Sequence, residues 1–136
     1  MATYNKFNQT VEDMANGVYN CATNQFVVAL TVAAPVATNT VLANLTEIAY
    51  TNLSSRNLTT ASSGQTSGTF TQLFSDLVLT ASGGAVAAFR YITIYSDTPT
   101  SPADPLLCFY DFGSSLVLAD GETLTIDFTT STFTLA

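Results

Sequence analysis

Three aspartates between positions 97 and 111 come nearest to catalytic chemistry in this sequence: Asp97, Asp104 and Asp111. Paired carboxylates can act as general acid and base, and their oxygens are also the ligands that Ca²⁺ prefers. The three flank a proline-rich segment without EF-hand spacing, so turn-forming aspartates that bond their own backbone are the better interpretation. Asp111-Phe112-Gly113 spells the magnesium motif of protein kinases, but the sequence has no glycine-rich phosphate loop to accompany it. We therefore expect no enzymatic activity, no metal and no cofactor.

The overall composition also argues against catalysis and metal binding. The 136 residues include no histidine, and ten acids against three bases give a net charge of −7, which argues against binding nucleic acid. The first residues show no secretory signal, and no apolar run reaches 18 residues, so we expect no membrane helix. In a chain without an export signal, Cys21 and Cys108 are expected to be buried free thiols, with a disulfide between them as the alternative.

Arg90 is the only base in the second half of the chain and lies within an apolar, alternating segment. A partly buried arginine needs a carboxylate partner, and Asp111 or Asp127 on a neighbouring strand could supply it. We expect an internal ion pair, with a contact to another subunit as the alternative.

An amphipathic helix is predicted for residues 4–17. Apolar side chains recur there at steps of three and four: Tyr4, Phe7, Val11, Met14, Ala15 and Val18. Thr3 can cap the start, and Gly17 stands where a left-handed C-terminal cap is expected. Because a helix of four turns is not stable alone, its apolar face must pack on a sheet of its own chain or on a neighbouring subunit.

Residues 86–95 form the strongest predicted strand. Phe89 and Tyr91 are expected on one face, and Ile92 and Ile94 on the other. Since both faces are largely apolar, this strand is expected in the centre of a sheet.

Further strands follow from apolar runs and turn residues. They are expected at residues 25–31, 39–50, 69–80, 106–112 and 115–128. Gly113 is expected to end a strand, and Asp120-Gly121 to form the type I′ turn of a hairpin between residues 115–119 and 122–128. The polar residues 51–68 are expected to form a long loop.

The fold class that follows is mainly β. The chain is expected to be a single domain in which residues 22–136 form a β-sandwich or a small β-barrel, preceded by one N-terminal amphipathic helix. The 23 threonines and 12 serines, with charged residues at only 10%, suit either a surface that a partner covers or an ordinary soluble β-domain.

Several short sequence motifs along nearly the whole chain carry a family resemblance. They are Phe7-Asn8-Gln9, Val11-Glu12-Asp13, the segment from Ala34 to Val41, Phe89-Arg90-Tyr91, the segment from Tyr95 to Pro105, Gly113-Ser114-Ser115 and Asp120-Gly121-Glu122. Together they resemble the capsid decoration (cement) proteins of tailed bacteriophages. These motifs are typical of loops and contain no catalytic signature.

The resemblance implies a structural virion protein. Such a protein is made in the host cytoplasm, binds the outer surface of the capsid and stabilises contacts between subunits of the major capsid protein. It is expected to be a homo-oligomer, with a trimer favoured, and to bind neither nucleic acid nor membrane. The alternative is a phage tail or fibre component that binds a host surface glycan.

Candidate contacts lie in three segments expected to be exposed: residues 1–7, 51–68 and 96–105. The side chains predicted to touch another subunit or the capsid are Tyr4, Phe7, Arg56, Arg90, Asp97, Thr98, Pro99 and Asp104.

Overall fold

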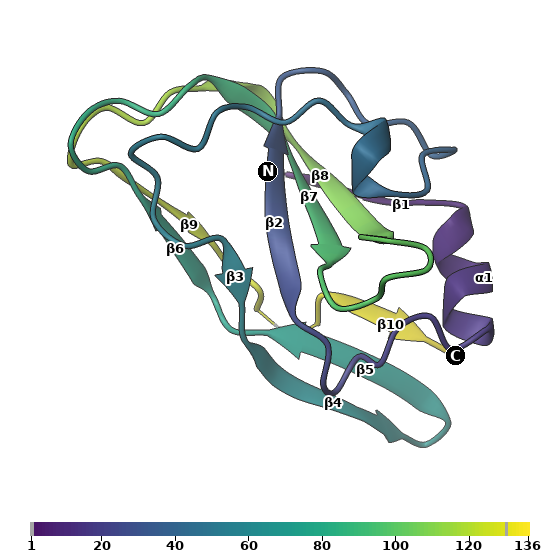
Figure 1. Cartoon of the computed structure of the whole chain (residues 1–136). Helices are drawn as coiled ribbons and strands as arrows, with labels where there is room; N and C mark the ends of the chain where they lie inside the picture. The colour runs from purple at the N-terminus through teal and green to yellow at the C-terminus, as the bar shows by residue number, and fades with distance from the viewer. Residues whose placement is uncertain (1, 130) are drawn as a thin grey trace.

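Two packed layers of antiparallel strands make up most of the computed structural model, which describes residues 2–129 and 131–136 (Figure 1). The first layer has five strands in the order β1-β8-β7-β2-β3. Their bounds are β1 Thr3–Lys6, β2 Phe26–Thr31, β3 Asn57–Leu58, β7 Phe89–Ser96 and β8 Leu106–Leu116. The predicted mainly β, sandwich-like domain with one helix is therefore confirmed, and β7 lies at the centre of its sheet as expected.

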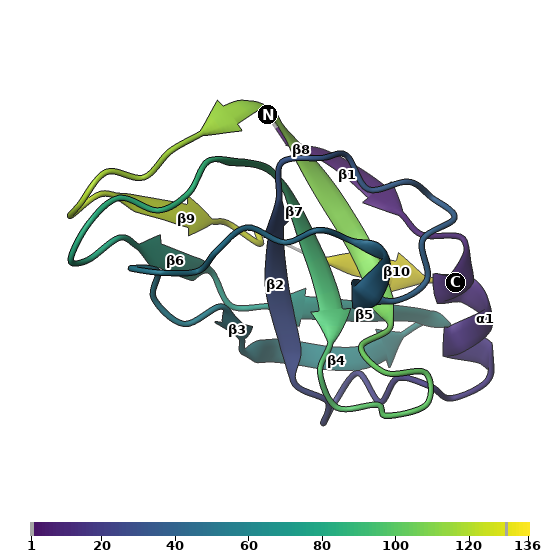
Figure 2. The same cartoon turned by 45° about the horizontal axis from the view of Figure 1, so that its top comes forward.

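The second layer consists of two short sheets, β10-β5-β4 and β6-β9. Their strands are β4 Thr60–Thr66, β5 Thr69–Phe74, β6 Leu77–Thr80, β9 Thr123–Ile126 and β10 Phe133–Leu135. Hydrogen bonds of the linking segments lie where the two sheets adjoin: the Phe128 N–H donates to the Asp76 carboxylate, and the Thr132 N–H donates to the carbonyl of Gln72 at 2.7 Å. The two short sheets follow one another and cross the strands of the first layer (Figures 1 and 2).

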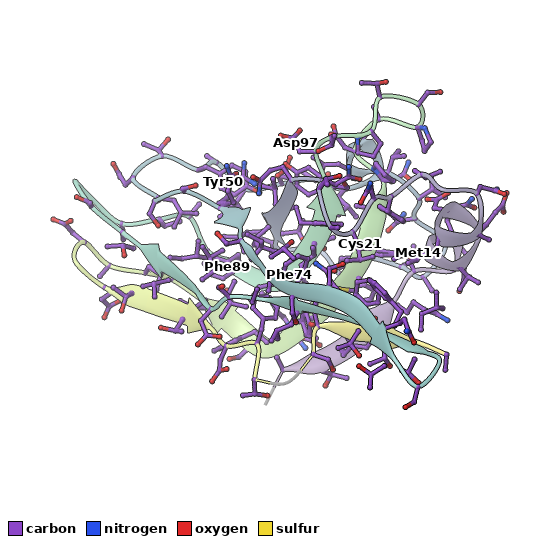
Figure 3. All side chains as sticks on the ribbon, turned by 90° about the horizontal axis from the view of Figure 1, so that it is seen from below. Met14, Cys21, Tyr50, Phe74, Phe89 and Asp97 are labelled. Atoms are coloured by element: carbon purple, nitrogen blue, oxygen red, sulfur yellow. The ribbon has the colours of Figure 1, made fainter. Side chains whose placement is uncertain are left out.

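The main core lies between the layers and is built around aromatic side chains. The Phe74 ring lies 5.2 Å from the ring of Phe26 and 5.8 Å from that of Phe128, so it links β5 with β2 and with the segment after β9. Phe74 and Phe89, both labelled in Figure 3, are 1% and 0% exposed. The two layers are therefore held together by direct contact of large apolar groups.

A second core covers the opposite face of the five-stranded sheet. Along β2, Phe26 and Val28 face the first core, whereas Val27 and Ala29 face the second. Both faces of β2 are covered, which explains why the whole strand is a continuous buried apolar run.

The connection after β2 covers this second core without joining the sheet. The strand predicted at residues 39–50 is wrong: the segment holds only the short 3₁₀ helix η1 (Leu42–Asn44) and isolated bridges. The Asn44 side chain accepts the backbone N–H groups of Thr40 and Val41, which gives the backbone an alternative to a strand ladder. Leu42 and Leu45 of this connection pack on the second core.

The N-terminal helix is shorter than predicted. Helix α1 spans Gln9–Ala15, and residues predicted as its first turn form strand β1, where Tyr4 pairs with Tyr110. The edge of β8 offers β1 a backbone ladder, and Phe7 is buried against Phe109 with ring centroids 5.1 Å apart. The helix does end before Gly17, which has the expected positive φ of 70°. Thr3 therefore caps no helix.

The predicted loop at residues 51–68 is also wrong, because its second half forms a β-hairpin. Strand β4 pairs with β5 from Thr60↔Phe74 to Thr66↔Thr69. Ser67 and Gly68 have φ of 51° and 84°, as a tight hairpin turn requires. The pairing uses backbone groups, so the polar side chains of β4 remain exposed and its composition does not indicate a strand.

Strand β8 continues through Gly113, which was expected to end it. Residues 112–115 bulge outward between the pairs Tyr91↔Asp111 and Phe89↔Leu116, and Gly113 adopts a φ of 97°. This register shift turns Phe89 into the main core, so it does not share a face with Tyr91.

The hairpin predicted around Asp120-Gly121 is formed only in part. The Glu122 N–H donates to the Ala119 carbonyl at 2.9 Å, so the turn exists, but only Gly121 of the central pair has a positive φ, which excludes type I′. The strand after this turn, β9, pairs with β6 and not with residues 115–119.

One buried hydroxyl predicts a stabilising substitution. Thr93 on β7 is 0% exposed, and its Oγ1 makes no hydrogen bond within the described residues. Thr93→Val replaces this hydroxyl with a methyl group of the same shape, so we expect the free energy of unfolding to rise by about 1 kcal/mol. Urea unfolding of both proteins measures the change, and a loss of stability would show that the hydroxyl is hydrogen-bonded.

Candidate contact surface

Helix α1 lies at the edge of the first layer, where two of the three predicted contact segments meet. The Thr10 hydroxyl donates to the Leu107 carbonyl at 2.8 Å, which attaches the helix to β8. Strand β1 precedes the helix, and the β7–β8 loop (residues 96–105) and the C-terminal strand β10 lie beside it (Figures 1 and 2). The helix predicted to pack on its own sheet or on a neighbouring subunit therefore packs on its own sheet and leaves its outer side exposed.

Mostly apolar side chains line one side of α1, with Lys6 among them. Tyr4, Val11 and Leu135, from β1, α1 and β10, are 43%, 50% and 47% exposed and line one hollow of about 90 Å³. Met14 and Leu135 also line a larger hollow of about 520 Å³ that extends to Cys21. The Met14 and Cys21 sulfur atoms lie 3.9 Å apart, and both residues are labelled in Figure 3. Large apolar groups from the N-terminal and C-terminal parts of the chain are thus gathered at one place.

Two strand edges border the same side. Within the described residues, β1 and β10 are terminal strands of their sheets, so each carries backbone N–H and C=O groups on its outer edge without a strand partner. Such edges can pair with a further extended segment.

The other side of α1 is polar. Gln9 and Asp13 face a hollow of about 240 Å³ whose further walls are Thr40, Val41 and Pro102. Pro102 belongs to the β7–β8 loop, so this loop borders the hollow. We call the surface on both sides of the helix the α1 face and define it by these residues: Tyr4, Gln9, Val11, Asp13, Met14, Thr40, Val41, Pro102 and Leu135.

The predicted contact residues of the β7–β8 loop are accessible. Asp97 (Figure 3) and Thr98 are exposed, and Pro99 and Asp104 are half-buried. The Thr98 hydroxyl accepts the Gln25 N–H at 2.8 Å, which holds the start of the loop. Partial burial and the neighbouring Asp97 carboxylate raise the pKa of Asp104, so the two acids lie close together.

Phe7 and Arg56, also predicted as contacts, make their contacts with other residues inside the fold. Phe7 is 0% exposed. The Arg56 guanidinium lies 3.6 Å from the Tyr50 ring centroid and 3.6 Å from a Glu47 carboxylate oxygen, and it donates to the Val28 carbonyl. The sequence indicated neither the Glu47 partner nor this stacking, because both depend on how residues 47–56 return to the edge of β2.

Arg90 forms the internal ion pair that the sequence predicted. Its Nε and an Nη donate to the two carboxylate oxygens of Asp111 at 2.8 and 3.0 Å, and the Gly113 N–H donates to the same carboxylate at 2.8 Å. Of the two predicted partners, Asp111 is therefore the one used. The pair ties β7 to the bulge of β8.

The Arg90–Asp111 pair predicts acid-dependent stability. Hydrogen bonds from Arg90, and then from Gly113, hold the pKa of Asp111 below its usual value of about 3.9. A carboxylate with a lowered pKa in the folded state stabilises the fold above about pH 4 and loses this effect as the pH falls through the lowered pKa. Asp111→Asn should thus be less stable than the wild type at pH 7, and the difference should shrink below about pH 4.

Urea unfolding between pH 7 and pH 2 measures this difference. Asp127→Asn is the matched control, because within the described residues Asp127 makes no ion pair. A loss that is equally large at all pH values, or equal in the two variants, would contradict the assignment.

The unpaired charges of the surface are mostly acidic. Within the described residues, two of the ten acids are paired with the two arginines and Asp13 is buried, which leaves seven acids at the surface and, among the bases, Lys6 alone. A field of this sign favours a partner with a basic surface.

The two cysteines are free, as the sequence led us to expect. Cys108 is fully buried, and burial raises the pKa of its thiol to about 12, whereas Cys21 is half-buried at the larger apolar hollow.

Comparison with known proteins assigns no family to the chain. No family model, no curated protein and no solved structure matches it. Within residues 2–129 and 131–136, no helix is long and apolar enough to cross a membrane.

Proposed function

We propose that this chain is a capsid decoration protein, a structural virion protein that binds the outer surface of a bacteriophage capsid and stabilises contacts between subunits of the major capsid protein. The observation that carries the proposal is the α1 face, where exposed apolar side chains of three segments adjoin two strand edges without partners. The resemblance of the short loop motifs to those of cement proteins supplies the class of partner. Both features suit a protein that acts by attachment.

The α1 face has the properties that attachment needs. Stable protein interfaces bury about 1,200–2,000 Å² in total and concentrate their binding energy in a few apolar anchors near the centre. Tyr4, Val11 and Leu135 provide such anchors, and the exposed Asp97 with the half-buried Asp104 of the β7–β8 loop supplies a polar rim. Where one oligomer engages several capsid sites at once, the effective affinity rises without any new contact.

Co-sedimentation with capsids tests the proposal. Purified protein is mixed with expanded empty capsids that lack it, and we expect saturable binding at micromolar concentration and a higher temperature of capsid disruption. Immunogold labelling of virions should mark the head. Absence of binding, or gold on the tail alone, would refute the proposal, and a tail label together with signal on a glycan array would support the alternative glycan-binding function.

The oligomeric state is measured separately, by light scattering of the free protein. A trimer is expected from the resemblance, and a monomer would remove the contribution of several sites binding at once.

A further inference from the structure

Asp13 is a buried carboxylate with one oxygen atom that accepts no hydrogen bond within the described residues. The residue is 4% exposed, and its Oδ2 atom has no hydrogen-bond partner within the described residues. Its Oδ1 atom accepts the Gln9 side-chain N–H at 3.2 Å, across one turn of α1. Leaving a buried carboxylate oxygen without a hydrogen-bond donor costs free energy. A ligand that supplies such a donor therefore gains binding energy.

The hollow that Asp13 lines suits a long side chain with a charged end. Val41 and Pro102 offer apolar walls for methylene groups, and Gln9 and Thr40 offer side-chain oxygens. The Gln9 amide donates to Asp13, so its own oxygen remains an acceptor; the Thr40 hydroxyl donates to Asn44 at 3.2 Å and likewise keeps a free lone pair. Three residues that carry oxygen acceptors thus line one small hollow.

We propose that this hollow seats the ammonium group of a lysine from the protein partner, with Asp13 as its counter-ion; the partner's identity as a capsid subunit rests on the proposed function above. Lysine fits better than arginine, because a guanidinium binds both oxygens of a carboxylate side by side and Gln9 already holds one of them. A single carboxylate with neutral oxygens also matches the three donors of an ammonium group. Asp97 and Asp104 on the adjacent loop add negative potential that attracts the cation.

Titration with a small amine tests the site without any capsid. The probe is n-butylammonium chloride, and the control cation is tetramethylammonium, which has the same charge but no N–H donor. Both are added to ¹⁵N-labelled protein at constant ionic strength. We expect saturable shifts of the amide signals of Gln9, Asp13 and Val41 with n-butylammonium only.

Two variants isolate the carboxylate. Asp13→Asn keeps the bond from Gln9 but loses the charge, so it should weaken n-butylammonium binding at least tenfold. Glu12→Gln removes the same charge from the exposed side of α1 and should change binding less than twofold. If Asp13→Asn does not fold, the contrast between the two cations in the wild type decides the question by itself.

Three results would overturn the lysine site: no saturable shift with n-butylammonium, equal shifts with tetramethylammonium, or equal weakening in both variants. These outcomes are independent of capsid binding. Capsid binding without an n-butylammonium site would remove this inference alone, and an n-butylammonium site without capsid binding would remove the proposed function alone.

Discussion

Replacing Phe74 by alanine is expected to lower the free energy of unfolding by about 3–5 kcal/mol. The ring is 1% exposed and contacts Phe26 and Phe128, so its loss leaves a cavity between the two layers that neither neighbour can fill without moving a strand. Urea unfolding of the purified variant measures the change. The loss is a large part of the total stability of about 5–15 kcal/mol that a domain has.

Val78→Ala on β6 is the matched control for this prediction. Val78 is 50% exposed, so its truncation should change stability by less than about 0.5 kcal/mol. If Phe74→Ala cost no more than this control, the two layers would not be held together by the core described above.

The double replacement Tyr4→Ser and Leu135→Ser is expected to weaken capsid binding by roughly 30- to 1,000-fold. Burying an apolar side chain in an interface contributes about 1–2 kcal/mol when it is half-exposed beforehand, and every 1.4 kcal/mol is a factor of ten in affinity. Both side chains line the same hollow on the α1 face, so a partner that covers it loses both anchors. Quantitative co-sedimentation with empty capsids gives the ratio.

The control for the binding experiment is Val78→Ser with Val117→Ser. These valines are 50% and 53% exposed, and their segments lie at the end of the molecule opposite α1 (Figure 1). This variant should bind capsids like the wild type. Because Tyr4 also packs on Tyr110 with ring centroids 5.6 Å apart, thermal unfolding of the Tyr4→Ser and Leu135→Ser variant is measured too. Equal binding of both double variants, with both folded, would place the contact surface elsewhere.

The elements predicted correctly are those that depend on burial along a single segment. Strands β2 and β7 are apolar on both faces, and that pattern is sufficient to place them inside a sheet. An internal ion pair of Arg90 was also predictable, because a base among apolar neighbours needs a carboxylate from an adjacent strand, but the choice of Asp111 over Asp127 was left open.

The segments wrongly predicted as a helix turn, a loop or a strand end share a physical cause, which is pairing through the backbone. Strand β4 is polar and exposed yet paired along its length, and β1 carries a spacing that also suits a helix. Gly113 permits a bulge in β8 as easily as an end. These pairings are made by backbone groups, so the local pattern of side chains does not reveal them. Residues 39–50 fail for the opposite reason, because the Asn44 side chain accepts the backbone N–H groups of Thr40 and Val41.

The candidate site divides in the same way. Tyr4, Asp97 and Asp104 were predicted as contacts from their segments and are accessible in the fold, whereas Phe7 and Arg56 make their contacts inside it. Val11 was named only as part of the apolar helix face, and Leu135 and Asp13 were not singled out, because a leucine near the C-terminus and one more acid carry no signal of their own.

What the sequence determined by itself is the mainly β class, the central strands, the acidic charge and the internal pairing of Arg90. Apolar runs, charge and alternation are properties of single segments, so they can be read without knowing which other segments pack beside them. Only the tertiary structure decided that β1, α1, β10 and the β7–β8 loop meet around one helix (Figures 1 and 2). That meeting depends on which strand edges pair across more than 100 residues, as Thr3 does with Asp111, and such pairing is set by the free energy of the whole chain.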